Sequence, residues 1–238
     1  MSLLATVLPL ICWFAYNNGV PVIERRYPSL SSIMSLQRRR WVANAAHAET
    51  PYDAILAGNL MGSVSFLAST AALLVLATFA GFGQLENITR TLASVTLDQP
   101  HTQREVEIHL AVLLSMFVLA FFAFTLSLRQ FNHFCIMLGA LDRKGRAGEA
   151  ELDAIAQINV LAARNFNNGI RALYFAVPMV AWFIADWLAI AVAILMLGFV
   201  VYREFFSSAH RAAAAIAVDA GQRRDDAAQK TGFPPSRE

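Results

Sequence analysis

The stretch from Leu56 to Phe82 reads LAGNLMGSVSFLASTAALLVLATFAGF and contains no charged residue. Crossing the hydrocarbon core of a bilayer takes about 20 residues in helical form. Because the bilayer core offers no water, a spanning segment must satisfy its own backbone hydrogen bonds, and a helix does so. The stretch therefore predicts a transmembrane helix and places the chain among integral membrane proteins.

Three further apolar stretches cover residues 3–22, 108–128 and 172–202. With 56–82 they predict an all-α fold, an integral membrane bundle of about four transmembrane helices with amphipathic cytoplasmic helices. The fourth stretch is interrupted by Pro178 and Asp186, but two full crossings need about 40 residues. We therefore expect either one tilted, kinked span there or a shallow entry into the membrane interface. The predicted membrane domain is 1–206, and a tail over 207–238 is expected to be amphipathic and then disordered.

Composition narrows the function classes. Of the 238 residues, 15% are charged and 57% are hydrophobic, whereas soluble domains average about 25% charged residues. A net charge of +2 is too small to indicate nucleic-acid binding.

Cys12 and Cys135 are expected to be ordinary buried thiols, and no metal-ligand pair occurs. His109 and His133 lie about 36 Å apart on a helix, so they cannot share a haem iron. We expect no cofactor and no metal.

The distribution of Lys and Arg predicts the orientation, because these residues concentrate on the cytoplasmic side of membrane proteins. The loops after the first, second and third spans carry five, two and six basic residues. This pattern places the first and third loops inside and the N-terminus outside, in a bacterial inner (cytoplasmic) membrane. The tail from Arg203 disagrees, since it carries six basic residues that four spans would place outside.

Amides and guanidinium groups occur at the inner ends of all four predicted spans. They are Asn17 and Asn18, then Asn59, then Arg129 and Asn132, and finally Asn167, Asn168 and Arg171. Polar groups in lipid are costly unless paired, so we expect a hydrogen-bonded layer, with Glu24 and Asp53 as counter-ions of Arg129 and Arg171. One interpretation is a cytoplasm-facing pocket for a small anion or an anionic lipid head group. The other interpretation is a purely structural role, in which the amides hold the helices together and the arginines snorkel to the membrane surface.

Two other features suggest further roles. Asp186 lies within the fourth stretch between Trp182 and Trp187. An acid inside a membrane is a functional hypothesis, but a helix break near the interface, where tryptophans also belong, explains it equally. Gly58 and Gly62 form a GxxxG match on the second span. Small residues at this spacing let helix backbones approach closely, so we expect this face to pack within the chain or in a dimer.

The chain resembles the uncharacterised bacterial and plant membrane family known as domain of unknown function 599. The likeness lies in Arg39-Arg40-Trp41, Gly58-Asn59-Leu60-Met61, Ala68-Ser69-Thr70, residues 127–133, residues 166–175, Pro178, Trp182 and Tyr202-Arg203-Glu204-Phe205. It covers about residues 10–206. The chain departs from the family pattern at Ala185-Asp186, where a Gly-Pro break is expected. The resemblance implies a membrane fold without an assigned activity.

The sequence leaves three function classes open. The favoured one is a non-enzymatic structural or partner-binding membrane subunit, whose partners would be the lipid bilayer, an anionic lipid, a second copy or a membrane complex. The alternative is a small oligomeric transporter or channel that uses Asp186 and the polar layer. The third is a membrane enzyme or cofactor carrier, although the sequence contains no G-x-S-x-G, H-E-x-x-H, P-loop or GxGxxG motif.

Overall fold

The computed structural model describes residues 2–47, 52–97, 99–142 and 147–216, and every regular element within them is an α-helix. The elements are α1 (Ser2–Glu24), α2 (Leu30–Ala45), α3 (Tyr52–Phe82), α4 (Leu85–Val95), α5 (Gln103–Ala140), α6 (Glu149–Trp182) and α7 (Asp186–Phe205). The predicted all-α bundle is confirmed. Four helical segments are long and apolar enough to cross a membrane: 2–24, 52–82, 103–140 and 186–216.

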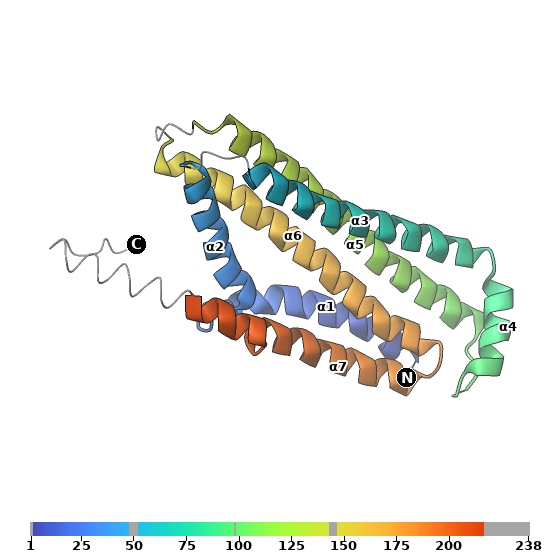
Figure 1. The fold of residues 1–238 in the computed structure, drawn as a ribbon. Coiled ribbons are helices and arrows are strands. Elements are labelled where there is room, and N and C mark those ends of the chain that lie inside the picture. The colour runs from blue at the N-terminus through green and yellow to red at the C-terminus, as the bar shows by residue number, and fades with distance from the viewer. Residues whose placement is uncertain (1, 48–51, 98, 143–146, 217–238) are drawn as a thin grey trace.

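The long helices lie side by side in one bundle, with α6 in its centre (Figure 1). Figure 1 shows α1, α5 and α7 running in one direction and α3 and α6 in the other. α6 contacts α1, α2, α5 and α7, whereas α3 packs mainly on α5. The surface of α3 is therefore open, and only 11% of the residues in its most apolar stretch are buried. This exposure fits a helix solvated by lipid.

Two shorter helices close the ends of the bundle. α2 runs crosswise to the long helices (Figure 1), and it begins after Ser29, whose Oγ accepts a hydrogen bond from the Ser32 backbone N–H at 3.0 Å. This N-cap satisfies a backbone donor that the helix itself leaves unpaired. α4 lies at the opposite end, where its apolar face packs against the ends of α3 and α5.

The core between α5 and α6 is aromatic and closely packed. Phe124 and Phe134 of α5 and Phe175 of α6 are fully buried. Gly169 allows the two helices to approach, because a Cβ there would lie 2.6 Å from Cε1 of Phe124. The backbone contact at Gly169 therefore fixes the position of α6 against α5.

The predicted single span over 172–202 is wrong. α6 ends at Trp182, Ala185 is extended (φ −164°, ψ 145°), and α7 begins at Asp186 and runs back along α6. The apolar run thus combines the end of α6 with nearly all of α7. The prediction failed because the first half of α6 is polar, although that half continues the same helix. Hydropathy measures exposure to lipid, and a central helix can carry polar side chains that face its neighbours.

The tail and one loop are only partly described. Residues 208–216 form a further helical segment after α7. The disorder predicted for the end of the tail falls on residues 217–238, which lie outside the described residues. Residues 143–146, between α5 and α6, lie outside them as well.

Candidate functional site

A cavity of about 570 Å³ lies between the end of α1, the crosswise helix α2 and the middle of α6. Its polar lining comprises Asn17, Glu24, Ser31, Ser32, Ser35, Arg38, Arg164, Asn167, Asn168 and Arg171. This volume is in the range of ligand pockets, which span about 300–1,000 Å³. The cavity therefore has the size and the polar groups of a binding site, and we call it the arginine cavity.

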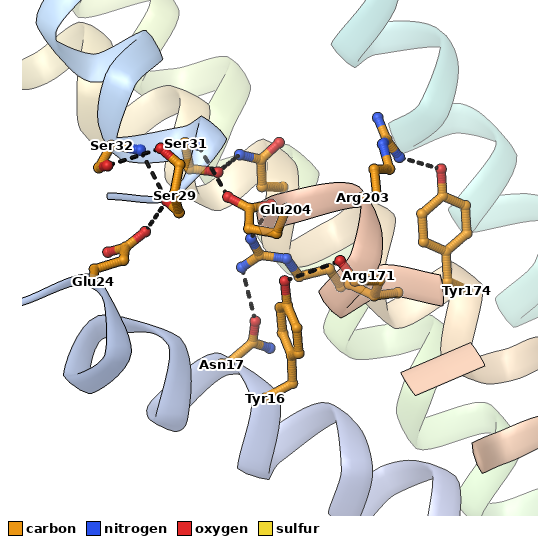
Figure 2. A network of polar contacts seen from close by, with 12 residues as sticks. Tyr16, Asn17, Glu24, Ser29, Ser31, Ser32, Arg171, Tyr174, Arg203 and Glu204 are labelled. Atoms are coloured by element: carbon orange, nitrogen blue, oxygen red, sulfur yellow. Dashed lines mark hydrogen bonds and ion pairs between the residues drawn. The ribbon is translucent and has the colours of Figure 1, made fainter. Parts of the chain in front are cut away.

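Arg171 of α6 is held from three sides. Its Nη1 donates to Oδ1 of Asn17 at 3.2 Å, and its Nη2 lies 3.5 Å from Oε2 of Glu204 on α7. The guanidinium carbon also lies 4.8 Å from the ring centroid of Tyr16. Figure 2 shows these contacts converging from α1 and α7. With its side chain only 12% exposed, Arg171 is a positioned cation and not a snorkelling surface arginine.

Glu204 connects α7 to the start of α2. Its Oε1 accepts a hydrogen bond from the Ser31 backbone N–H at 3.0 Å, in the first turn of α2 (Figure 2). Asn167 Nδ2 donates to the Ser31 hydroxyl from the opposite side at 3.4 Å. Because helix N-termini favour negative charge, the Glu204 carboxylate occupies a position that an external anion would also favour.

Two further arginines give the cavity its charge. Arg38 Nη1 donates to Oδ1 of Asn159 at 2.5 Å, and burial lowers the pKa of the Arg38 guanidinium, which nevertheless stays charged at neutral pH. Arg164 is exposed and lines the same cavity. The one acid in the lining, Glu24, accepts a hydrogen bond from the Ser29 hydroxyl. The described lining thus holds three guanidinium groups and one carboxylate, and Arg171 is in addition paired with Glu204.

The structure brings together only part of the predicted polar layer. Asn17, Asn167 and Arg171 line the arginine cavity together with Asn168. The other predicted members, Asn18, Asn59, Arg129 and Asn132, are all exposed on the surface of the bundle. The Asn18 amide donates to its own helix, at the Phe14 carbonyl, so it does not reach the cavity.

The predicted counter-ions of the arginines are also wrong. Arg171 pairs with Glu204, whereas Asp53 accepts a hydrogen bond from Trp41 Nε1 at 2.5 Å. Glu24 accepts a hydrogen bond from Ser29. Sequence reasoning missed Glu204 because a four-span topology places the end of the last helix at the opposite end of the bundle from α2. The sequence signal for Glu204 was that it lies just after the end of the long apolar stretch 172–202.

Asp186 lies at the break between α6 and α7 and not in the middle of a helix. It is the first residue of α7 and is partly buried. With Glu105 and His101 it lines a second cavity of about 480 Å³ beside Trp187, which is 58% exposed. This cavity is at the end of the bundle away from the arginines, as the position of the α6–α7 turn in Figure 1 shows.

Behind the second cavity, Trp182 is stacked between two histidines. Its ring centroid lies 3.9 Å from those of both His101 and His109. His109 is fully buried, with one ring nitrogen 3.0 Å from the Thr6 hydroxyl and the other 2.8 Å from the Met179 carbonyl. These contacts tie α1, α5 and α6 together. Among the described residues, no group of three or more His, Cys, Asp or Glu residues is arranged to hold a metal ion.

The predicted packing face on α3 is turned outward. Gly58 and Gly62 are exposed, and a Cβ added to either would meet no atom within 4 Å. The GxxxG face therefore packs against nothing in the described part of the chain.

Cys12 and Cys135 are free thiols, as expected, and the Cys135 sulfur lies 3.5 Å from that of Met61.

Comparisons with known proteins identify a family. The sequence profile of the family described as "Protein of unknown function, DUF599" matches residues 4–209. No curated protein and no solved structure was found to match the chain. The match covers α1 to α7 and therefore every residue of the arginine cavity.

Proposed function

This chain belongs to the DUF599 family, and from its geometry we propose that it is a membrane-embedded, non-enzymatic binding protein whose arginine cavity takes a phosphate-bearing ligand. The observation that carries this proposal is the cavity lining, in which the described residues include three arginines, Arg38, Arg164 and Arg171, and one acid, Glu24. Arg171 is also paired with Glu204, so the cavity keeps a net positive charge. The planar guanidinium group is suited to two-pronged hydrogen bonding with phosphate oxygens.

The distribution of charge along the bundle supports a cytoplasmic position for the cavity. α6 has 34 residues, a length of about 51 Å, and lies antiparallel between α5 and α7 (Figure 1). Counting α6 as a fifth crossing places the tail at the same end of the bundle as α2. Of the 12 Lys and Arg residues in the described part of the chain, all but Arg90 and Arg104 then lie toward that end. The positive-inside rule assigns this end to the cytoplasm and the N-terminus to the outside.

The test is phosphate binding by the full chain in detergent, measured calorimetrically with inorganic phosphate and glycerol 3-phosphate as probes. Arg164→Gln removes an exposed guanidinium of the cavity, and it should weaken binding about tenfold, the effect of one charge-assisted hydrogen bond. Arg129→Gln is the matched control, since Arg129 is equally exposed but outside the cavity. Equal weakening by both variants, or no binding of either probe, would contradict the proposal.

A second candidate function is association with another copy through α3. It rests on Gly58 and Gly62, whose outward face meets none of the described residues, since small residues at this spacing support close helix contact in membranes. Gly62→Leu should abolish a dimer on blue-native gels in mild detergent. Gly198→Leu is the control, because Gly198 on α7 is also exposed and without neighbours within 4 Å. A wild-type chain that is monomeric in every detergent would exclude this candidate.

A further inference from the structure

We propose that the ligand of the arginine cavity is an anionic phospholipid of the surrounding bilayer, with its phosphate among the arginines and its acyl chains along α1 and α2. This inference rests on the proposed function and adds the class of ligand. Three observations carry it: the apolar walls of the cavity, its depth along α1, and the sign of its charges.

Apolar side chains line the cavity together with the polar ones. Val20 and Pro21 of α1, Leu30 and Met34 of α2, and Phe166 of α6 all line it. Outside the cavity lining, α1 also exposes apolar side chains toward its middle, with Phe14 64% and Ile11 54% exposed. A free anion such as phosphate gains nothing from these walls, whereas a lipid places its glycerol and first methylene groups against them.

The cavity also lies at the depth of a lipid head group. Asn17 and Glu24 line it from the last two turns of α1, after the apolar residues that would fill the bilayer core. α2 lies crosswise at this level (Figure 1), as expected for a helix at the membrane surface. The volume of about 570 Å³ accommodates a head group and leaves the acyl chains outside, on the exposed surfaces of α1 and α2.

The charges favour an anionic over a zwitterionic lipid. A choline or ethanolamine head group would bring a further cation into a lining where Arg38, Arg164 and Arg171 already outnumber Glu24, and like charges in a partly buried site repel. A phosphatidylglycerol head group carries the phosphate charge without an amine. We therefore expect selection for phosphatidylglycerol over phosphatidylcholine of the same chain length.

The experiment measures lipid retention by native mass spectrometry on the full chain, titrated with phosphatidylglycerol or phosphatidylcholine of matched acyl chains. Wild type should retain phosphatidylglycerol at least about tenfold more strongly, and Arg164→Gln should remove the preference. Met34→Gln places an amide on the apolar wall and should reduce retention. Leu36→Gln is its control: both residues lie on α2 with 43% and 41% exposure, but only Met34 lines the cavity.

The outcomes separate this inference from the proposed function. If glycerol 3-phosphate binds but the two lipids are retained equally, the lipid inference is overturned and the phosphate site stands. The same holds if Met34→Gln and Leu36→Gln behave alike. If neither the soluble probes nor phosphatidylglycerol binds, both proposals fail together.

Discussion

At the scale of single residues, Gly169 is the position that the packing constrains most. A Cβ there would lie 2.6 Å and 2.8 Å from ring atoms of the fully buried Phe124. Gly169→Ala must therefore displace the ring or separate α5 from α6, and overpacking of this kind costs about 1–3 kcal/mol. We expect a clearly lower thermal unfolding temperature in detergent, measured by intrinsic tryptophan fluorescence.

Gly198→Ala provides the comparison for this prediction. Gly198 also lies inside a long helix, but an added Cβ would meet nothing within 4 Å. Alanine is a better helix former than glycine by about 1 kcal/mol, so the unfolding temperature should be unchanged or slightly higher. If both variants lost the same stability, the close contact between Gly169 and Phe124 would not be the cause of the loss.

Glu204 has two opposing effects on the site. Its carboxylate stabilises the fold through Arg171 and Ser31, and it competes with any external anion for the same groups. Glu204→Gln keeps an acceptor for the Ser31 N–H but removes the negative charge. Because both side chains of the pair are only 11–12% exposed, we expect a stability loss of about 1–3 kcal/mol. Phosphate affinity should rise at the same time.

Glu107→Gln serves as the control for Glu204. Glu107 pairs with Arg104 at 3.0 Å, but both side chains are well exposed, and such pairs contribute at most about 1 kcal/mol. Neither stability nor phosphate binding should change measurably. If Glu204→Gln weakened phosphate binding, Glu204 would be a structural support of the site and not a competitor within it.

At the scale of helices, α2 depends on one capping residue beside the cavity. Ser29 is fully buried, accepts a hydrogen bond from Ser32 N and donates one to Glu24. Ser29→Ala should therefore cost about 1–2 kcal/mol and weaken phosphate binding, because Ser31 and Arg38 share this helix. Ser63→Ala, which removes an exposed hydroxyl on α3, should do neither. Normal phosphate affinity in Ser29→Ala would mean that the cap does not position the site.

The helices also show what sequence reasoning can reach. α3 could be predicted because its central residues are uncharged and face outward, so its hydropathy reports its surroundings directly. The continuity of α6 as one long helix could not be predicted, because it is enclosed by α1, α2, α5 and α7. Its Asn159 is fully buried yet accepts a hydrogen bond from Arg38. A polar residue satisfied by another helix looks, in sequence alone, the same as one in a loop.

The same limit explains the partial prediction of the site. Asn17, Asn167 and Arg171 could be found because each is a polar residue at the edge of an apolar run. Glu204 and Ser31 could not, because their proximity depends on α7 returning along α6 to the start of α2. A local sequence pattern is enough to predict that a polar cavity exists. To predict which residues line it, one must also know how many helices cross the membrane.

At the scale of the whole molecule, the number of crossings decides where the tail lies. With four crossings, the six basic residues from Arg203 onward would lie on the outside with the N-terminus. With α6 as a fifth crossing, the two of them that the structure describes, Arg203 and Arg211, lie at the same end of the bundle as α2 and the start of α6. The ion pair between Arg171 and Glu204 requires the end of α7 to be near the end of α1, which supports the second arrangement.

Labelling single cysteines in intact cells with a membrane-impermeant maleimide tests this arrangement on the full chain, after Cys12 and Cys135 are replaced by alanine. Ser94, Asp153 and Ser208 are exposed in α4, at the start of α6 and after α7. We expect Ser94→Cys to be labelled at once, and Asp153→Cys and Ser208→Cys only after the cells are opened. Labelling of Ser94→Cys and Ser208→Cys together would mean that α6 does not cross, whereas the reverse pattern would keep the crossing and invert the orientation.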